Sequence, residues 1–519
     1  MGRPVALIAP VLLSLQLAGC ATWALMSAPD HADAPWTPAT NSAGEIVAGE
    51  RAPPGQPPKR DYVLPSNSNL AGVPAPASEL ERHRPYTLPE MIDIAESSNP
   101  TTRNAWNDAR DAALVAGIAE STFLPLVSAG IVQGWQQSHS ENSTLGLTST
   151  SNTTAQGNIE ALSIQWLLFD FGERAALVDA AKQGSVISNI AFTAAHQQVI
   201  YNVSLAFYAY AAARERLASA GESLRDAEEV GSAAQNRYKQ GIGTVVEVTQ
   251  TRQATAQAQL ERIQAEGAAE NAYLALISAL GVSPITKLRI ADVSRRKLST
   301  SMMAPVERVV SAALARRPDV LTGYAALRAS LANLQAAQAA FLPKVFLAAN
   351  GTRLSGSLDI TAIPGIGKEL PILNLPNQVG FSGTQFGSTA LIGATVPVYD
   401  GGVRAASLEQ ARDKVDKAET TLSQIRNEAA RQIIVARNNL KTSLSAYSAS
   451  TTLAAAAQTT FNAALASYRN GVGSITDVTL SERQLLAAKN AQTDAYSTAL
   501  SSAATLALAA GALGAAPHQ

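Results

Sequence analysis

The chain carries two copies of one plan. The phrase RYKQGIGTVVEVTQTRQ, which contains Tyr238, returns as SYRNGVGSITDVTLSERQ, which contains Tyr468. The spacing between these tyrosines equals the spacing between Asp170 in LFDFGERAALVDAAKQ and Asp400 in PVYDGGVRAASLEQARDK. A duplication on this scale constrains the fold strongly, because both copies must form the same local structure.

The rest of each half repeats in the same order. Pro100 corresponds to Pro318, and Pro125 in FLPLV corresponds to Pro343 in FLPKV. The two prolines of each pair are fewer residues apart than Asp170 and Asp400 are. The second copy must therefore carry extra residues between Pro343 and Asp400. We expect the extra residues in a surface loop. Each half is predicted to run helix, strand, loop, strand, long helix, turn, long helix.

Long helices give the strongest periodic signal. No proline interrupts the chain from Gly172 to Lys239, and a continuous helix of that span is roughly 100 Å long. Apolar residues recur at spacings of three and four, which is typical of a coiled-coil seam rather than of a globular helix. In the second half these positions are Leu408, Ala411, Val415, Ala418, Leu422, Ile425, Ala429, Ile433, Ala436, Leu440, Leu444 and Tyr447. In the first half they are Leu177, Ala180, Gly184, Ile187, Ala191 and Ala194.

Short alternating segments precede the long helices. The apolar positions are Leu162, Ile164, Trp166 and Leu168 in the first half, and Ala390, Ile392, Ala394 and Val396 in the second. One apolar and one small polar face fits a strand between lipid and a wet lumen, although a half-buried strand of a soluble domain gives the same alternation. Preceding strands at 126–135 and 345–353 complete two hairpins, with polar loops expected at about 136–156 and 354–387. Four strands cannot close a barrel and an open edge cannot face lipid, so other copies of the chain must complete the sheet.

The N-terminus reads as an export signal. Arg3 precedes an apolar stretch that ends in the tetrad LAGC, and the stretch is too short to span a membrane as a helix. The tetrad resembles the bacterial lipobox, which implies cleavage before Cys20 and acylation of its thiol; the alternative is an ordinary signal peptide. Ala21 after the cysteine implies sorting to the outer membrane. Since Cys20 is the only cysteine, the mature chain has no disulfide and no cysteine metal site.

Each repeated phrase reads as the tip of a helical hairpin. RYKQGIGT closes one long helix, turns at Gly241 and Gly243, and restarts at Thr244, as helix stop and start signals predict. SYRNGVGS does the same with Gly471 and Gly473. We expect this tight reversal to need a positive φ and to leave no room for side chains.

Several features together resemble the TolC family of outer-membrane efflux proteins over residues of about 86–514. They are the duplicated plan, the paired Tyr-x-x-Gly-x-Gly tips, the Phe-Leu-Pro leads into the first strands, and the Asp-x-Gly exits at Asp170 and Asp400. The lipobox is similar to that of the lipid-anchored, OprM-like branch. The resemblance implies a mainly α homotrimer with β-barrel segments. Four strands per chain would complete a twelve-stranded transmembrane β-barrel, and the internally duplicated long-helix hairpins would form a trimeric periplasmic α-barrel tunnel.

This organisation predicts the following segments. They are a signal peptide at 1–19, an acylated Pro-rich tether at 20–85, a first repeat at 86–283, an equatorial connection at 284–304, a second repeat at 305–514 and a C-terminal tail at 515–519.

The sequence offers no catalytic, metal or cofactor site. The five histidines are scattered without metal-ligand spacing, and neither a phosphate-binding glycine-rich lysine motif nor a nucleophile elbow is present. A formal net charge of −1 with 16% charged residues argues against a nucleic-acid-binding protein. We therefore expect no enzyme, no cofactor and no nucleic-acid partner.

The resemblance implies the exit duct of a tripartite efflux system. Anchored in outer-membrane lipid and extending into the periplasm, it would passively export small molecules that an inner-membrane transporter delivers through a periplasmic adaptor (membrane fusion) protein. A type I secretion exit duct is the alternative within the family. Two alternatives of other classes are a lipid-anchored coiled-coil scaffold without a pore and a periplasmic binding protein. The alternating hairpins argue against the first, and the long heptad helices argue against the second.

The tips carry the candidate site residues. In the TolC family the aspartate at the Asp477 position lines the closed periplasmic aperture, and here Leu480 follows it on the same helix face. Glu247 is the first-half counterpart of Asp477. The alternative is a capping role, because Ser474 with Asp477 and Thr244 with Glu247 have the spacing of a capping box.

The tip glycines are a second candidate site. We expect them to form the surface on which the periplasmic adaptor docks, with the alternative that they serve only the turn. They are Gly241, Gly243, Gly471 and Gly473.

Overall fold

The chain forms two compact units, Met1–Leu80 and Glu81–Gln519. The computed structural model describes residues 38–47, 63–64, 66–70, 84–144, 147–292, 306–362 and 379–514, together with some isolated positions. The predicted signal peptide, Cys20 and the tail at 515–519 lie outside the described residues.

The smaller unit contains local structure where only an extended tether was expected. Strands β1 (Ala39–Thr40) and β2 (Ile46–Val47) pair antiparallel, and η1 (Ser68–Leu70) follows. The Asn67 side-chain amide donates a 2.8 Å hydrogen bond to the Gly44 carbonyl oxygen. Polar asparagine side chains that bond to nearby backbone account for this small fold, which an apolar periodicity cannot reveal.

Both halves of the larger unit follow the predicted order from the first strand onward. The first half has α2 (Leu88–Ser98), α3 (Pro100–Ser121), β4 (Leu126–Thr144), β5 (Leu147–Phe169), α4 (Glu173–Lys239) and α5 (Val245–Leu280). The second half has α6 (Val306–Leu314), α7 (Pro318–Ala339), β7 (Lys344–Ala362), β8 (Val379–Thr395), α9 (Val403–Arg469) and α10 (Ile475–Ala509). Helices α4 and α9 are each 67 residues long, which confirms the predicted long helices. Short strands β3 (Pro85–Tyr86) and β6 (Arg289–Ile290) pair in parallel.

Each half begins with two helices where the sequence predicted one. The break falls at Pro100 in the first half and at Pro318 in the second, and each proline is the first residue of its helix. Proline suits that position because its missing N–H would have no partner there, and it disfavours helical backbone in the preceding residue.

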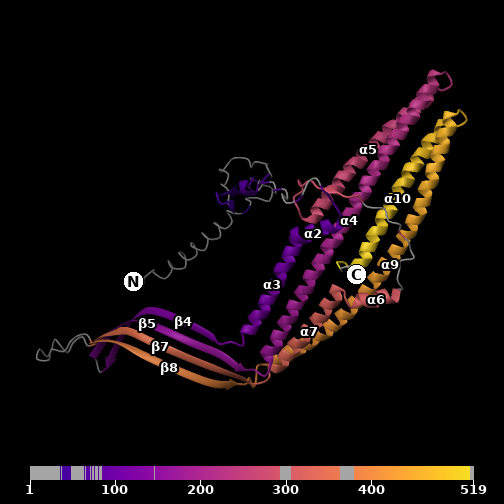
Figure 1. The fold of residues 1–519 in the computed structure, drawn as a ribbon. Helices are drawn as coiled ribbons and strands as arrows, with labels where there is room; N and C mark the ends of the chain where they lie inside the picture. Colours follow the sequence, from indigo (N-terminus) through magenta and orange to yellow (C-terminus); the bar gives the residue numbers. More distant parts are fainter. Residues whose placement is uncertain are drawn as a thin grey trace, which may run out of the picture. The chain divides into compact units, whose positions relative to one another are not determined.

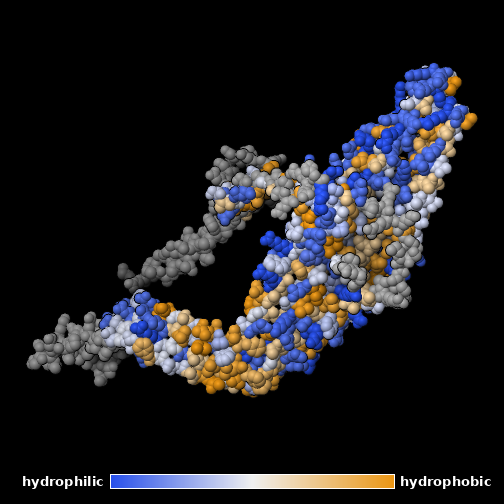
Figure 2. All heavy atoms as spheres, viewed as in Figure 1, coloured by the Kyte–Doolittle hydropathy of each residue, from blue (hydrophilic) through white to orange (hydrophobic). Residues whose placement is uncertain are grey.

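Within the larger unit, the strands gather at one end and the helical hairpins extend to the other. Figure 1 shows the α4/α5 and α9/α10 hairpins side by side, with their tips together and away from the sheet. Figure 2 shows hydrophobic side chains gathered over the part of the sheet nearest the helices and over the helix ends next to it, whereas hydrophilic residues dominate at the far end of the strands and near the tips. Among the described residues, none of the helices combines the length and the apolar character that crossing a membrane requires.

The four-stranded sheet confirms most of the predicted faces, with two exceptions. A β-bulge between Leu167 and Phe169 leaves Leu168 out of the predicted row, and Val396 follows the end of β8. The strand order is β4-β5-β7-β8. Trp166 pairs with Leu347, which pairs with Ile392, so one apolar row crosses three strands. On the other face, the hydroxyl groups of Ser128 and Ser163 lie 2.7 Å apart in a hydrogen bond. Successive side chains of a strand point to opposite faces, so these rows separate apolar from polar surface.

The predicted polar loops are wrong in extent. The ladder between β4 and β5 continues through the Ser- and Thr-rich stretch to the pair Thr144 and Leu147, so strand replaces most of the loop expected at 136–156. Strands β7 and β8 likewise extend into the span 354–387, and residues 363–378 between them lie outside the described residues. Backbone pairing satisfies N–H and C=O groups whatever the side chains are, which explains why polar composition misled the prediction.

A row of glycines crosses the whole sheet. Gly134 pairs with Gly157, which pairs with Gly356, which pairs with Gly383. A Cβ atom on Gly356 would lie 2.4 Å from the Gln156 carbonyl oxygen, so the two central strands approach too closely there for a side chain. Glycine in a strand interior often marks such a close approach or bend.

Equivalent aspartate–arginine ion pairs stabilise the two junctions between a strand and the following long helix. The Asp170 carboxylate accepts hydrogen bonds from the Arg174 backbone N–H at 2.9 Å and from its Nε at 2.8 Å, and the Arg174 guanidinium lies 4.8 Å from the Phe123 ring centre. In the second half Arg404 Nε lies 2.6 Å from an Asp400 oxygen. The Asp-x-Gly exits therefore fix how each long helix starts.

The predicted seam is correct in the second half and wrong in part of the first. Ala429, Ile433 and Ala436 of α9 are buried, as expected. In α4, Leu177 is exposed while Ala176 and Val178 are buried. Helix α4 contacts α3, α5, α7 and α10, so its buried surface is not one narrow stripe.

Candidate functional site: the paired hairpin tips

The two tips have the same backbone structure. In the first, the Gly241 N–H donates to the Tyr238 carbonyl at 3.0 Å and the Ile242 N–H donates to the Arg237 carbonyl at 3.1 Å. Gly471 and Val472 make the corresponding bonds at 3.0 Å each in the second tip. This pair of bonds is the Schellman motif, which satisfies the last carbonyl groups of a helix.

The tip glycines are required for two different reasons. Gly241 and Gly471 have φ values of +76° and +81°, a region that side chains with a Cβ disfavour. Gly243 and Gly473 have no room instead. A Cβ on Gly243 would lie 2.8 Å from the Tyr238 nitrogen, and one on Gly473 would lie 3.0 Å from the Tyr468 nitrogen. Both expectations for the turn are confirmed, each at a different glycine.

Only one of the two hydrogen bonds of the expected capping box, the one accepted by the serine or threonine oxygen, is found among the described residues of each tip. Ser474 Oγ accepts a 3.1 Å hydrogen bond from the Asp477 backbone N–H, and Thr244 Oγ1 accepts one of 3.2 Å from the Glu247 N–H. The carboxylates make other contacts, since the Asp477 carboxylate accepts a 2.8 Å bond from the Ser474 hydroxyl. The cap therefore resides in the serine and threonine, and the acid side chains are not needed for it.

Tyr468 joins the two tips. Its hydroxyl donates to a Glu247 carboxylate oxygen at 3.3 Å. The Arg237 guanidinium lies 5.0 Å from the Tyr468 ring centre and donates to the Tyr468 carbonyl oxygen at 3.2 Å. Burial raises the pKa of Tyr468, and the Glu247 charge raises it further, so the hydroxyl stays protonated as a donor. Arg469 also forms an ion pair with Glu229 across the same contact.

An apolar cluster lies beneath this contact. Its fully buried members come from α4, α9 and α10, and they are Val230, Ala234, Phe461, Tyr468, Ile475, Val478 and Leu485. Fully burying a side chain such as Leu485 stabilises the packed state by about 1.5–3 kcal/mol. This cluster holds the second tip against the first.

The predicted aperture residues do not come together within one chain. Asp477 is exposed, and Leu480 is 54% exposed one turn further along α10. Glu247 is half-buried and bonded to Tyr468. No hydrogen bond or ion pair joins Asp477 to Glu247 in the described part of the chain. An exposed acid next to an exposed leucine is therefore a feature of the second tip alone.

Sequence reasoning missed the role of Tyr468. The two tip tyrosines are equivalent in sequence, but Tyr468 is 1% exposed and Tyr238 is 44% exposed. A signal was present in the residue before each tyrosine, which is Arg237 in the first copy and Ser467 in the second. Only the first copy supplies the arginine that contacts the opposite tyrosine.

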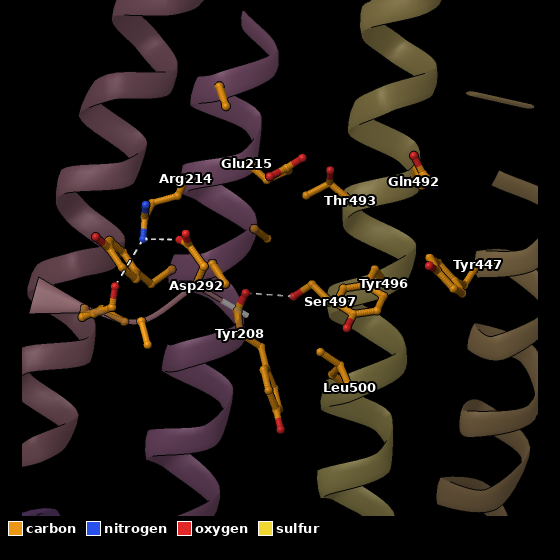
Figure 3. Close-up of a pocket in the computed structure, with 16 residues that line it drawn as sticks. Tyr208, Arg214, Glu215, Asp292, Tyr447, Gln492, Thr493, Tyr496, Ser497 and Leu500 are labelled. Carbon is orange, nitrogen blue, oxygen red and sulfur yellow. Dashed lines mark hydrogen bonds and ion pairs between the residues drawn. The ribbon is translucent and has the colours of Figure 1, made fainter. Parts of the chain in front are cut away.

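A cavity of about 430 Å³ lies along the helices away from the tips. Figure 3 shows Tyr208 on α4 next to Ser497 on α10, with Tyr496 nearby, whereas Arg214 on α4 extends toward Asp292. The Ser497 hydroxyl donates to the Tyr208 carbonyl oxygen at 3.2 Å, and Arg214 forms a 3.0 Å ion pair with Asp292. No group of histidine, cysteine, aspartate or glutamate among the described residues could hold a metal ion.

Comparisons with known proteins give a consistent result. The family model of the outer membrane efflux protein matches residues 91–282 and 309–512. The chain is similar to Protein CyaE of Bordetella pertussis, with 26% identity over 73% of each chain. It is similar to Outer membrane protein OprJ of Pseudomonas aeruginosa, with 24% identity over 64% of each chain. Its fold is similar to the CmeC outer membrane channel of Campylobacter jejuni, with a TM-score of 0.62, 20% identity and coverage of 84% of this chain and 90% of that one.

Proposed function

The chain belongs to the outer membrane efflux protein family, and we propose that three copies of it form the passive exit duct of a tripartite efflux system. The observation that carries this proposal is the pair of matched hairpins, with first helices of 67 residues each. Helices of that length extend roughly 100 Å, which suits a tunnel rather than a compact domain. An inner-membrane transporter would deliver small molecules to the tunnel through a periplasmic adaptor protein.

The open sheet supports assembly of several copies. In the order β4-β5-β7-β8, strands β4 and β8 are the edges. An unpaired edge in lipid leaves N–H and C=O groups unsatisfied, each at several kcal/mol. Pairing of β8 with β4 of the next copy removes both edges and closes a barrel of three chains in the outer membrane.

The second tip supplies the aperture in this proposal. Asp477 and Leu480 are exposed in one chain, and three-fold symmetry would place three copies of each around one axis. An acidic ring attracts cations, and an apolar constriction resists wetting. Glu247 would lie at the neighbouring hairpin, already bonded to Tyr468.

The adaptor would dock on the end of the tips. Ile242 is 61% exposed and Val472 is 84% exposed, and each lies between the two glycines of its tip. Exposed apolar side chains held on a rigid turn suit a protein partner better than solvent. Acylated Cys20 would anchor the N-terminus in the same membrane.

Trimer stability and conductance test the proposal together. Protein extracted from outer membranes should run as a heat-resistant trimer and should give channel currents in planar lipid bilayers. A trimer without current would support a pore-free scaffold instead, and a monomer without current would support a periplasmic binding protein.

A further inference from the structure

A row of polar contacts joins α4 to α10 along their length, and we name it the inter-hairpin seam. The contacts pair residues in opposite chain directions, so the two helices are antiparallel. The pairs are Tyr201 with Thr505, Tyr208 with Ser497, Arg216 with Asp494, Glu222 with Lys489, and Ser223 with Glu482. Figure 3 shows the Tyr208 and Ser497 contact.

Glu482 is the exception among the acids of this seam, because its buried carboxylate is paired with a serine hydroxyl, whereas Asp494 and Glu222 are each paired with a cation. It is 5% exposed and lies between the apolar Val478 and Leu485, one helix turn to either side. Ser223 Oγ donates to Glu482 Oε1 at 3.0 Å. No described cation forms an ion pair with it. A buried charge without a partner is costly, so the neutral acid is the form that this packing favours.

The charges around Glu482 add to the effect of burial. Asp226 from α4 and Glu261 from α5 face it with negative charge, and Arg483 on α10 is the opposing cation. Lys489 forms a 2.6 Å ion pair with Glu222 and not with Glu482. The α9 side chains of the adjacent cluster, Phe461, Tyr468, Ala457, Ala464 and Leu465, carry no charge at neutral pH.

Burial raises the pKa of Glu482 to about 7, with Asp226 and Glu261 acting in the same direction and the Ser223 hydrogen bond opposing them. Burial also raises the pKa of Asp226. A solvated glutamate has the ordinary value of 4.5. The packed seam therefore binds a proton that the separated helices release. Its stability is highest in acid, and it decreases as the pH rises from 4.5 to about 7.

We propose that the buried Glu482, which is bonded to Ser223 and lies between Val478 and Leu485, makes the inter-hairpin seam a pH-sensitive latch. The latch is closed when the carboxyl is protonated and loosened when it ionises. Glu482 lies five residues, or about 7.5 Å of helix rise, from Asp477 at the tip. Loosening of the seam frees α10 to move relative to α4 at the end where the aperture is proposed. The latch does not depend on the proposed channel function. Only its predicted effect on channel current rests on that function.

Hydrogen exchange across α10 tests the latch in the full-length protein. Exchange of α10 peptides would be measured between about pH 5.5 and about pH 8 and corrected for the intrinsic pH dependence of exchange. We expect the wild type to lose about tenfold or more in protection over this range, since a shift of one pKa unit changes an opening equilibrium about tenfold. Glu482→Gln should abolish the loss, and Glu419→Gln, at an exposed position of α9, should leave it intact.

A second variant separates the latch from general loosening. Ser223→Ala removes the hydrogen bond that favours the ionised carboxylate, so the midpoint of the protection change should move to higher pH. A pH dependence that persists in Glu482→Gln, or a midpoint that Ser223→Ala leaves in place, overturns the inference. In planar bilayers the wild type should open more readily as the pH on the tip side rises. If no current is found while exchange follows the pattern above, the channel function fails and the latch stands.

Discussion

The hydroxyl of Tyr468 donates a 3.3 Å hydrogen bond to the carboxylate of Glu247, and this contact joins the tip of the second repeat to the start of α5 in the first. The two equivalent tip acids, Glu247 and Asp477, therefore have different hydrogen-bond partners. Glu247 accepts a hydrogen bond from the other repeat, whereas the partner of Asp477 among the described residues is Ser474 of its own turn. A duplicated sequence has thus acquired one structural acid and one exposed acid.

Removal of the tyrosine hydroxyl should loosen the contact between the tips. Tyr468→Phe keeps the ring beneath Arg237 and loses one hydrogen bond to a charged group, so we expect a destabilisation of about 1.5 kcal/mol. Tyr238→Phe is the matched control, since Tyr238 is the equivalent residue in the first tip and is exposed. Thermal unfolding of both variants measures the difference. Equal melting temperatures would show that the Tyr468 hydroxyl contributes nothing to the contact.

Substitutions at two neighbouring positions of the second tip, Val472 and Gly473, should distinguish adaptor docking from formation of the turn. Val472→Asp adds charge to an 84% exposed side chain, so we expect unfolding within about 0.5 kcal/mol of the wild type but weaker crosslinking to the adaptor. Gly473→Ala should destabilise the turn by about 1–3 kcal/mol, because its Cβ would lie 3.0 Å from the Tyr468 nitrogen. Normal adaptor crosslinking by folded Val472→Asp and Gly473→Asp trimers would place docking elsewhere.

The sequence predicted the long helices, the tips and most of the strand faces because each depends on local rules, but it did not reveal the β-bulge at Leu168. Helix α4 could be read from an unbroken span, and the turn could be read from Gly241 and Gly243, which obey separate steric limits. The extent of β4 could not be read, since its outer half is polar and is held by cross-strand backbone pairing to β5. That pairing is a non-local property.

The partners of individual side chains were also beyond local rules. The sequence differs before the two tyrosines, with Arg237 before Tyr238 and Ser467 before Tyr468, but only the structure shows that the Arg237 guanidinium lies over the Tyr468 ring. Glu482 did leave a trace, since it falls between Val478 and Leu485 in the apolar stripe of α10. An acid inside such a stripe indicates a buried carboxyl, although its Ser223 partner is remote in sequence.

The start of α7 should be sensitive to acid. Burial raises the pKa of Asp319, but hydrogen bonds and charge from Arg317 outweigh burial and hold the pKa below its usual value. Arg317 Nη1 also donates to the Ala509 carbonyl oxygen at 2.9 Å. The lowered pKa means that this stability is present above the ordinary pKa of aspartate and is lost as the pH falls through the folded value. Since Asp319 is partly exposed, the effect should be below about 1 kcal/mol.

The variant Asp319→Asn checks this assignment. Its melting temperature should be lower than that of the wild type at neutral pH. The two melting temperatures should converge in acid as the wild-type carboxyl becomes protonated. Asp93, for which the structure gives no such ion pair, provides the control substitution. A gap between Asp319→Asn and wild type that stays constant into acid would rule out the Arg317 ion pair as its cause.

Cys20 should be the acylated N-terminus of the mature protein. The tetrad LAGC ends in the only cysteine of the chain, and several acyl chains anchor a protein stably where one does so only weakly. Intact mass of the protein from outer membranes should correspond to a chain that begins at Cys20 and carries lipid. Cys20→Ala should shift the mass to an unlipidated form, and an unmodified N-terminus at any other residue in the wild type would contradict the prediction.

The last prediction separates the charge of Asp477 from the cap of its helix. The Asp477 backbone N–H donates to Ser474 Oγ, so substitution of the aspartate side chain leaves that bond in place. Asp477→Asn should keep the thermal stability within about 0.5 kcal/mol of the wild type. Ser474→Ala removes the cap and should cost about 1 kcal/mol, while the charge at position 477 remains.

In planar bilayers we therefore expect only Asp477→Asn, and not Ser474→Ala, to change the selectivity of the channel. If three Asp477 carboxylates surround the aperture, Asp477→Asn weakens both cation selectivity and block by multivalent cations added from the tip side, because the negative ring is gone. Ser474→Ala retains both properties at a temperature where it stays folded. Leu480→Ala, which alters the apolar neighbour without changing charge, should change conductance but not the preference for cations. Unchanged selectivity and block in Asp477→Asn would leave this residue an exposed acid beside a serine cap, with no part in the passage of ions.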